Sequence, residues 1–126
     1  MKTTLIVILL LTACGREAPR ETPPPTSSSA PQITGNVQTG KELIEKYACL
    51  ACHRIPGFAE PQGSMGPSLE GIASRPAIAG RVPNDPATMV AYLQNPPAVD
   101  PATRMPPLGI SEEEARHMTA YLFTLQ

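Results

Sequence analysis

The pentapeptide Cys49-Leu50-Ala51-Cys52-His53 stands near the middle of this 126-residue chain. It places two thiols three positions apart, with an imidazole directly after the second thiol. Cys-x-x-Cys-His is the attachment signal for a c-type haem. Each thiol can form a thioether with a haem vinyl group, and the adjacent histidine can offer a ring nitrogen to the iron as proximal ligand. The motif therefore predicts one haem c, covalently bound through Cys49 and Cys52, and a redox function.

Two other interpretations use the same residues. The first is a disulfide or thioredoxin-type redox pair of Cys49 and Cys52, but that motif normally lies in a βαβ unit and needs no histidine after it. The second is a zinc site that adds His117 to the pentapeptide. Zinc ligands usually recur as a second closely spaced pair, whereas His117 stands alone. We therefore interpret His117 as an exposed residue of a C-terminal helix.

Length and charge limit the class of protein. A chain with a formal net charge of -1 and 4% aromatic residues has room for one domain of modest size. Its lysines and arginines are scattered and form no basic stripe of the kind that a phosphate backbone requires. We therefore expect no nucleic-acid partner.

Residues 1–13 have the short basic start and the apolar run of a secretory signal peptide. The run is far too short to span a bilayer. Leu11-Thr12-Ala13-Cys14 resembles the lipobox of bacterial lipoproteins, in which the cysteine becomes the lipidated first residue of the mature chain. The alternative is an ordinary signal peptide with a chance cysteine. Lipidation of Cys14 predicts a stable membrane anchor, because each buried methylene contributes about 0.8 kcal/mol.

Residues 14–34 are predicted to form a disordered tether behind the lipidated cysteine. This stretch is rich in proline, serine and threonine and has no apolar periodicity, so it cannot bury enough surface to fold. All three cysteines of the chain then have covalent roles. Haem attachment and lipobox processing both follow export across the bacterial inner membrane. We expect a protein on the periplasmic side, lipid-anchored to either the inner or the outer membrane.

The folded domain is expected over residues 35–126, and its first helix is predicted to begin at a capping box. In that motif Thr39 and Glu42, three residues apart, satisfy two backbone N–H groups reciprocally. The apolar stripe of this helix leads directly into the pentapeptide. The stripe comprises Leu43, Ile44, Tyr47 and Ala48.

Two further helices are marked by their first residues. Asp85 places a capping oxygen ahead of a proline at the first helical position, and Pro96 ends this helix. Ser111 and Glu114 form a second capping box, and the last helix is expected to run to Leu125. The apolar faces of these two helices are Met89, Val90, Tyr92 and Leu93, and Ala115, Met118, Tyr121, Leu122 and Leu125.

The fold class predicted from these signals is all-α with long loops, because no segment shows strand-like alternation of useful length. The loops carry most of the prolines and glycines of the domain. Few large apolar side chains are available, so the core is inadequate for a domain of this size. A covalent haem would supply the missing apolar mass, and we expect the haem-free polypeptide to fold poorly.

Several motifs follow the pentapeptide in a fixed order. They are Gly66-Pro67-Ser68-Leu69, Arg75, Met105-Pro106-Pro107 and a last helix with Tyr121-Leu122. From Gly40 to Leu125 the chain thereby resembles the class I monohaem cytochromes c, including the cytochrome c domains fused to some terminal oxidase subunits. The resemblance implies the class I cytochrome c fold, with three main helices and long loops wrapped around one covalent haem.

The resemblance also implies roles for single residues. His53 would bind iron through one ring nitrogen and donate its other N–H to the carbonyl of Pro67. Arg75 matches the arginine that pairs with a haem propionate in this family. The chain has no tryptophan, whereas many members place one near a propionate. Tyr92 is expected to substitute for it through its hydroxyl.

Met105 is the predicted sixth ligand of the iron. It lies on a rigid Pro-Pro loop between two helices, where the family carries its ligand. A thioether is soft and stabilises ferrous iron, so it raises the reduction potential and closes the iron to substrates. Met89 and Met118 lie on apolar helix faces and are interpreted as core. Met65, in a glycine-rich loop, is the competing ligand.

Two functions from different classes follow. The first is a membrane-tethered electron carrier, with a quinol-oxidising complex or dehydrogenase as donor and a terminal oxidase or reductase as acceptor. It needs no small-molecule substrate and is not an enzyme. A fixed cytochrome subunit of a larger respiratory complex is a variant. The second is a haem enzyme or gas sensor, such as a small peroxidase, with an open distal site. Met105 argues against the second, and His117 is the one spare histidine.

Overall fold

The computed structural model describes residues 33–126. The expected signal peptide, Cys14 and most of the expected tether lie outside these described residues. The elements, in chain order, are α1 (Val37–Lys46), the 3₁₀ turns η1 (Cys49–Ala51) and η2 (Ile72–Ser74), the strands β1 (Ala77–Ile78) and β2 (Val82–Pro83), and the helices α2 (Pro86–Gln94), α3 (Pro96–Val99) and α4 (Glu112–Leu122). Over residues 33–126, no helix is long and apolar enough to cross a membrane.

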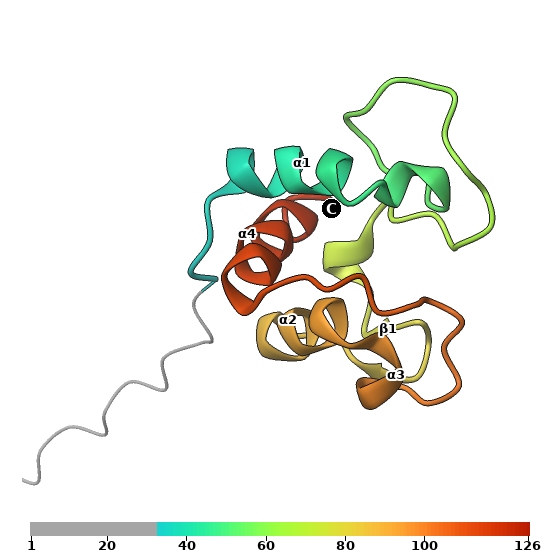
Figure 1. The fold of residues 1–126 in the computed structure, drawn as a ribbon, viewed down its shortest axis with the longest axis vertical. Helices are drawn as coiled ribbons and strands as arrows, with labels where there is room; N and C mark the ends of the chain where they lie inside the picture. Colours follow the sequence, from blue (N-terminus) through green and yellow to red (C-terminus); the bar gives the residue numbers. More distant parts are fainter. Residues whose placement is uncertain (1–32) are drawn as a thin grey trace, which may run out of the picture.

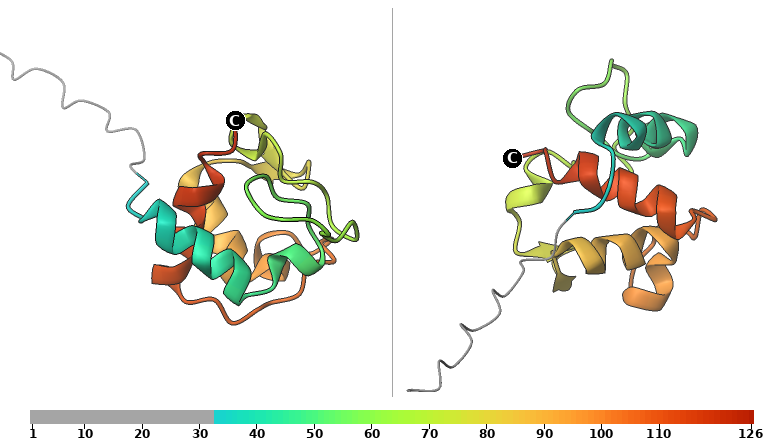
Figure 2. Two further views of the ribbon diagram at one scale, coloured as in Figure 1. Left: turned by 90° about the horizontal axis from the view of Figure 1, so that it is seen from above. Right: turned by 90° about the vertical axis from the view of Figure 1, so that its left-hand side faces the viewer.

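Three helices pack into one side of the molecule, and long loops form the other side (Figure 1, Figure 2). Helix α1 crosses α4, and α2 packs against the opposite side of α4. The all-α class is confirmed. The strands β1 and β2 were not predicted; they form a hairpin of two residues each, paired as Ala77 with Pro83 and Ile78 with Val82. Two residues are too short to show the alternation that marks a strand.

Helix α1 begins three residues earlier than the sequence analysis predicts. Its N-cap is Asn36, whose side-chain oxygen accepts the N–H of Thr39 at 2.9 Å. The capping box of Thr39 and Glu42 is therefore wrong, because asparagine is at least as strong an N-cap as threonine and Thr39 lies inside the helix. His117 is also not simply exposed: it is half-buried, and its Nδ1 accepts the backbone N–H of Asn36 at 2.8 Å.

The predicted starts of the other two long helices are confirmed. Asp85 caps α2, and Ser111 forms a reciprocal capping box with Glu114 at the start of α4. Helix α2 ends before Pro96, but this proline also opens the short α3, which was not predicted. Helix α4 ends at Leu122 rather than Leu125, because the chain tightens there and the Leu125 N–H bonds to the Leu122 carbonyl.

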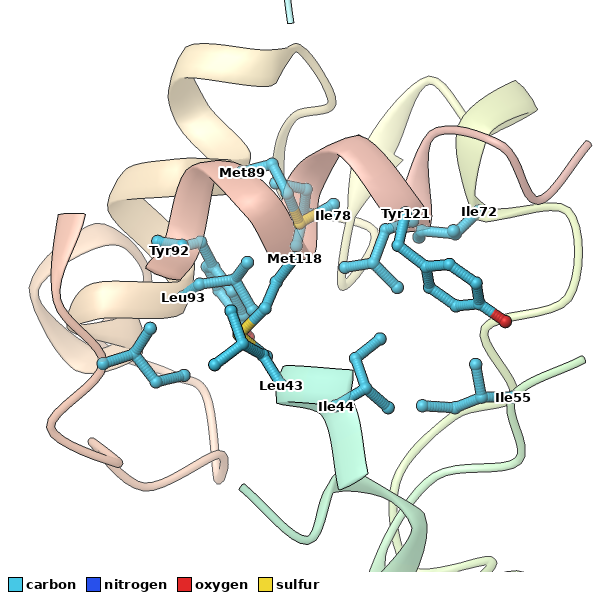
Figure 3. Close-up of a cluster of buried hydrophobic side chains, with 13 residues drawn as sticks. Leu43, Ile44, Ile55, Ile72, Ile78, Met89, Tyr92, Leu93, Met118 and Tyr121 are labelled. Carbon is cyan, nitrogen blue, oxygen red and sulfur yellow. The ribbon is translucent and has the colours of Figure 1, made fainter. Parts of the chain in front are cut away.

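Side chains from the three long helices and from the loops converge in one buried cluster (Figure 3). The methionines on the helix faces, Met89 and Met118, are both buried in it, as predicted. Tyr121 ties α4 to the loop after the pentapeptide, because its hydroxyl donates to the Pro56 carbonyl at 2.8 Å. The cluster comprises Leu43, Ile44, Ile55, Ile72, Ile78, Met89, Tyr92, Leu93, Ile110, Ala115, Met118, Tyr121 and Leu122.

The crossing of α1 and α4 requires a residue without a side chain. A Cβ atom on Gly40 would lie 2.0 Å from the carbonyl oxygen of His117 on α4. Real Cβ atoms do not approach a backbone oxygen this closely, so the two helices would have to separate. Gly40 therefore sets the distance between the two helices that frame the rest of the domain.

Glu114 joins the same two helices through polar contacts. Lys46 lies 2.7 Å from its Oε1, and the Tyr47 hydroxyl donates to its Oε2 at 2.8 Å. The hydroxyl of Ser111 also donates to Oε2, at 2.8 Å. Hydrogen bonds from Lys46, then Tyr47, then Ser111 hold the pKa of Glu114 at about 2, below its usual value of 4.5. The charged carboxylate is thus the form that the fold stabilises.

Replacing Gly40 by alanine is expected to lower the free energy of unfolding of the haem-loaded protein by about 1–3 kcal/mol, the usual cost of overpacking. Alanine is a better helix former than glycine, so helix propensity alone would change stability in the opposite direction. Thermal melts followed by circular dichroism measure the change. Glu45→Ala, at an exposed position of the same helix, is the matched control and should change stability little. A Gly40→Ala protein as stable as the wild type would contradict the close approach.

Replacing Glu114 by glutamine is expected to lower the melting temperature at pH 7. Because the pKa of Glu114 is lower in the folded protein, its contribution is fully present above about pH 4.5 and is lost as the pH falls toward 2. The melting temperatures of the variant and the wild type should therefore converge over this interval. Glu113→Gln, in the same turn, is the control. A difference that persists unchanged down to pH 2 would rule out this role for the charge.

Candidate functional site

A cavity of about 1080 Å³ lies between the helices and the loops. Its walls are mainly apolar, and they include Ile44 from α1, Met89 from α2 and Met118 from α4. Typical sites for small molecules and cofactors occupy roughly 300–1,000 Å³, so this cavity is large for a domain of this size. The site residues predicted from the sequence all line it; they are Cys49, Cys52, His53, Pro67, Arg75, Tyr92 and Met105.

The pentapeptide reaches the cavity through an abrupt turn after α1. Ala48 adopts the left-handed conformation with φ of 52°, which is uncommon for a residue with a side chain. The η1 turn follows, and the carbonyl of Cys49 accepts the N–H groups of both Cys52 and His53, at 3.1 and 2.9 Å. This compact turn brings both thiols and the imidazole to one wall of the cavity.

Cys49 and Cys52 form no disulfide, and their setting does not favour a redox dithiol. Burial raises the pKa of the Cys49 thiol to about 11, so this thiol stays protonated near neutral pH. A thioredoxin-type pair depends on a thiol with a lowered pKa. The two cysteines also lie between α1 and a loop, not in a βαβ unit.

The imidazole of His53 is held by the loop that follows the pentapeptide. Its Nδ1 lies 2.7 Å from the carbonyl oxygen of Pro67. A carbonyl only accepts hydrogen bonds, so Nδ1 must carry the proton and Nε2 is left with a lone pair. Gly66 packs directly against the ring, since a Cβ there would lie 2.4 Å from the Cε1 of His53. The Gly66 N–H donates to the Cys52 carbonyl at 2.8 Å and fixes the loop on the turn.

Met105 lines the cavity from the segment between α3 and α4. Its backbone N–H donates to the Thr103 hydroxyl at 3.3 Å, and this hydroxyl lies 2.7 Å from the hydroxyl of Tyr92 on α2. The Tyr92 hydroxyl therefore already has a protein partner; its predicted contact with a propionate stays a prediction. Thr103 is a site residue that the sequence analysis missed, because its link to Tyr92 depends on tertiary packing.

Met65 has a different position. The residue lines the cavity but is 78% exposed, and it directly precedes Gly66, which packs on the His53 ring. Met65 thus belongs to the same loop that supports the imidazole, whereas Met105 comes from a separate segment and is half-buried. Both methionines line the cavity, and Met105 is the more buried of the two.

Arg75 follows η2 and lines the cavity. Its guanidinium donates to the carbonyl of Glu70. None of the ion pairs among residues 33–126 includes Arg75. The cavity wall therefore carries a positive charge that no carboxylate of the described residues neutralises.

The chain matches, over residues 35–122, the family model described as cytochrome c oxidase, cbb3-type, subunit III. It is a member of this cytochrome c family. A cytochrome c-type cyt cy from Rhodobacter capsulatus is 34% identical over 106 residues, which cover 74% of this chain and 51% of the relative. Cytochrome c oxidase subunit 2 from Alkalihalophilus pseudofirmus is 27% identical over 88 residues, 69% of this chain and 25% of the relative. The chain spans about half and about a quarter of the lengths of these curated relatives.

Solved cytochrome c structures share the fold. Cytochrome c2 from Paracoccus denitrificans superposes with a TM-score of 0.55 at 19% identity, covering 70% of this chain and 93% of that one. Ferric cytochrome c-550 from Paracoccus versutus gives a TM-score of 0.54 at 21% identity, covering 72% and 98%. The class I cytochrome c fold predicted from the sequence is confirmed. Proteins of this family are haem-containing electron carriers.

The cavity of this cytochrome c fits a haem in three respects. Its walls are mainly apolar, its edge carries two thiols, and its histidine has an Nε2 lone pair available for a metal. The uncompensated guanidinium of Arg75 also suits the carboxylates of such a group. The chemistry of the donor set therefore agrees with the covalent haem c that the family implies.

Replacing Gly66 by alanine is expected to displace the His53 ring, because the new methyl group would overlap the imidazole. The Pro67 contact would then weaken, and the haem-loaded protein should lose part of its low-spin ferric absorption spectrum. Ser64→Ala, at an exposed position of the same loop, is the matched control. A Gly66→Ala protein with the spectrum of the wild type would show that the ring does not depend on this contact.

Proposed function

We propose that this cytochrome c is a membrane-tethered electron carrier with one haem c, covalently held through Cys49 and Cys52. His53, through its Nε2, and Met105, through its sulfur, would hold the iron. The observation that carries the proposal is the His53 ring, which Pro67 orients at the wall of an apolar cavity that Met105 also lines. A bound haem supplies a one-electron couple between ferric and ferrous iron.

His53 and Pro67 act together in this proposal. The Pro67 carbonyl keeps the proton on Nδ1, so that Nε2 presents its lone pair in one fixed orientation. The same hydrogen bond increases the basicity of the imidazole and limits its rotation. A ligand that does not move between oxidation states lowers the reorganisation needed for electron transfer.

Met105 supplies a soft thioether that favours ferrous iron and raises the reduction potential. Its half-buried side chain lies among mainly apolar walls, which would limit the access of water to a haem on this side of the cavity. A closed, dry site suits transfer of a single electron and leaves no position for a substrate. Arg75 is proposed to hold a propionate, and Tyr92 to support the Met105 segment through Thr103.

The anchor and the partners complete the proposal. Cys14, in its lipobox sequence, carries the lipid, and the proline-rich stretch behind it is the tether that lets the domain reach its partners. This places the protein on the periplasmic side of a bacterial membrane. A quinol-oxidising complex or dehydrogenase is the proposed donor, and a terminal oxidase or reductase is the proposed acceptor. The names of the matched family and of one relative, both oxidase subunits, support an oxidase as the acceptor.

The contacts of His117 remove the one spare histidine as a distal residue of a haem enzyme or sensor. An open distal site would need a polar residue beside the iron. His117, the one histidine outside the pentapeptide, accepts the Asn36 N–H at the junction of α1 and α4 and is not among the residues that line the cavity. A fixed subunit of a respiratory complex would use the same haem site and would differ from a free carrier only in its partner.

Replacing Met105 by alanine is expected to abolish the weak far-red band that a thioether ligand gives ferric haem. The iron should then become high-spin or bind carbon monoxide readily in the ferrous state. Absorption spectroscopy of the purified haem-loaded protein measures both effects. Met65→Ala is the matched control, because it removes an equally long thioether from the other loop and should leave the spectrum unchanged. Loss of the band in Met65→Ala and its survival in Met105→Ala would reverse the assignment.

A further inference from the structure

Asp100 carries a carboxylate that is almost completely buried, with only 5% of its side chain exposed. Arg81 is its partner: the guanidinium Nη2 and Nε lie 2.7 and 2.8 Å from the same carboxylate oxygen, Oδ2. The other oxygen, Oδ1, accepts the backbone N–H of Ala102 at 3.1 Å. Both oxygens are therefore engaged, and the Arg81 side chain, 49% exposed, covers the carboxylate from the solvent side.

The pair joins two segments that both border the haem cavity. Arg81 stands between β1 and β2, lines the cavity itself and donates its backbone N–H to the Ile78 carbonyl. Asp100 caps the C-terminal end of α3 and opens the segment that carries Met105. The Asp100 carbonyl accepts the Thr103 N–H at 3.0 Å, so the turn that begins at Asp100 fixes Thr103, which stands two residues before Met105.

The Met105 segment has few other polar attachments. Within the described part of the chain, residues 104–110 take part in only one hydrogen bond. The Met105 N–H donates it to the Thr103 hydroxyl. Pro106 and Pro107 are exposed, and a proline has no N–H to donate. The next hydrogen bonds along the chain are those of the capping box at Ser111, where α4 begins. The position of Met105 thus depends on the turn between Asp100 and Thr103.

We propose that Arg81 and Asp100 are positioning residues for Met105, which fix the ligand segment to the hairpin wall of the cavity. The proposal rests on the proposed function, because it takes Met105 as the axial ligand. Loss of Arg81 would leave a buried carboxylate without its counter-charge, and such a charge is strongly unfavourable. Asp100 would then turn toward water, and the segment that it opens would move with it. Hydrogen bonding to Arg81 also lowers the pKa of Asp100, as expected for a carboxylate that the fold keeps charged.

The test uses the ferric haem-loaded protein and imidazole as an external ligand. Imidazole binds to the iron only when Met105 leaves, so its affinity reports how readily the Met105 segment opens. Arg81→Gln and Asp100→Asn are expected to bind imidazole roughly tenfold more tightly than the wild type, which corresponds to about 1.4 kcal/mol. The far-red thioether band should weaken in both. In the double variant, the gain should be no larger than in either single variant, because both remove one interaction.

Lys46→Gln is the matched control. It breaks the Lys46–Glu114 pair, which has the same 2.7 Å separation as the Arg81–Asp100 pair but lies at the junction of α1 and α4. This control should lower the melting temperature and keep the imidazole affinity within about twofold of the wild type. Because Arg81 is half-exposed, we expect Arg81→Gln to fold. Its imidazole affinity can therefore be measured even if Asp100→Asn does not fold.

The outcomes distinguish the proposed ligation by Met105 from the positioning role of Arg81 and Asp100. A wild-type protein without the far-red band would overturn the proposed ligation and the role of the pair together. A wild type with the band, and variants whose imidazole affinity equals that of the wild type, would overturn the role of the pair alone. An equal rise in the Lys46→Gln control would also overturn it, because general destabilisation would then explain the opening.

Discussion

The large apolar cavity between the helices and the loops is the constraint on which the rest of the structure depends. Many of the buried side chains of α1, α2 and α4 also line this space. A domain of this size has little apolar surface to spare, so we expect its stability to depend on an apolar group in the cavity. The crossing at Gly40 and the polar contacts of Glu114 hold the frame around it.

The two walls of the cavity are built differently. On the His53 side, a compact turn, the Pro67 carbonyl and the packing of Gly66 fix the imidazole through several short contacts. On the Met105 side, a proline-rich segment with few hydrogen bonds depends on Thr103 and on the turn at Asp100. In the proposed ligation, His53 would bind the iron from the firmly held wall and Met105 from the lightly attached wall. External ligands would then enter at the Met105 side.

Local signals in the sequence predicted the elements that depend on few residues. The capping box at Ser111, the Asp85 cap and most of the apolar helix faces follow from short-range rules, and the structure has them. Ala48 and Leu125, which were predicted on these faces, lie beyond the ends of α1 and α4. The start of α1 was missed because two capping motifs compete and the contact of Asn36 with His117 decides between them. The pairing of Arg81 with Asp100 and that of Tyr92 with Thr103 were out of reach, because each joins segments that only the folded chain brings together.

The central claim is that this cavity holds one haem whose iron is bound by an imidazole nitrogen and a thioether sulfur. The iron K-edge X-ray absorption spectrum of the ferric wild-type protein tests it most directly, because sulfur and nitrogen scatter at different distances. A single sulfur neighbour beside the nitrogen neighbours is expected. A first coordination sphere of nitrogen alone, or one that contains oxygen in place of sulfur, would contradict it.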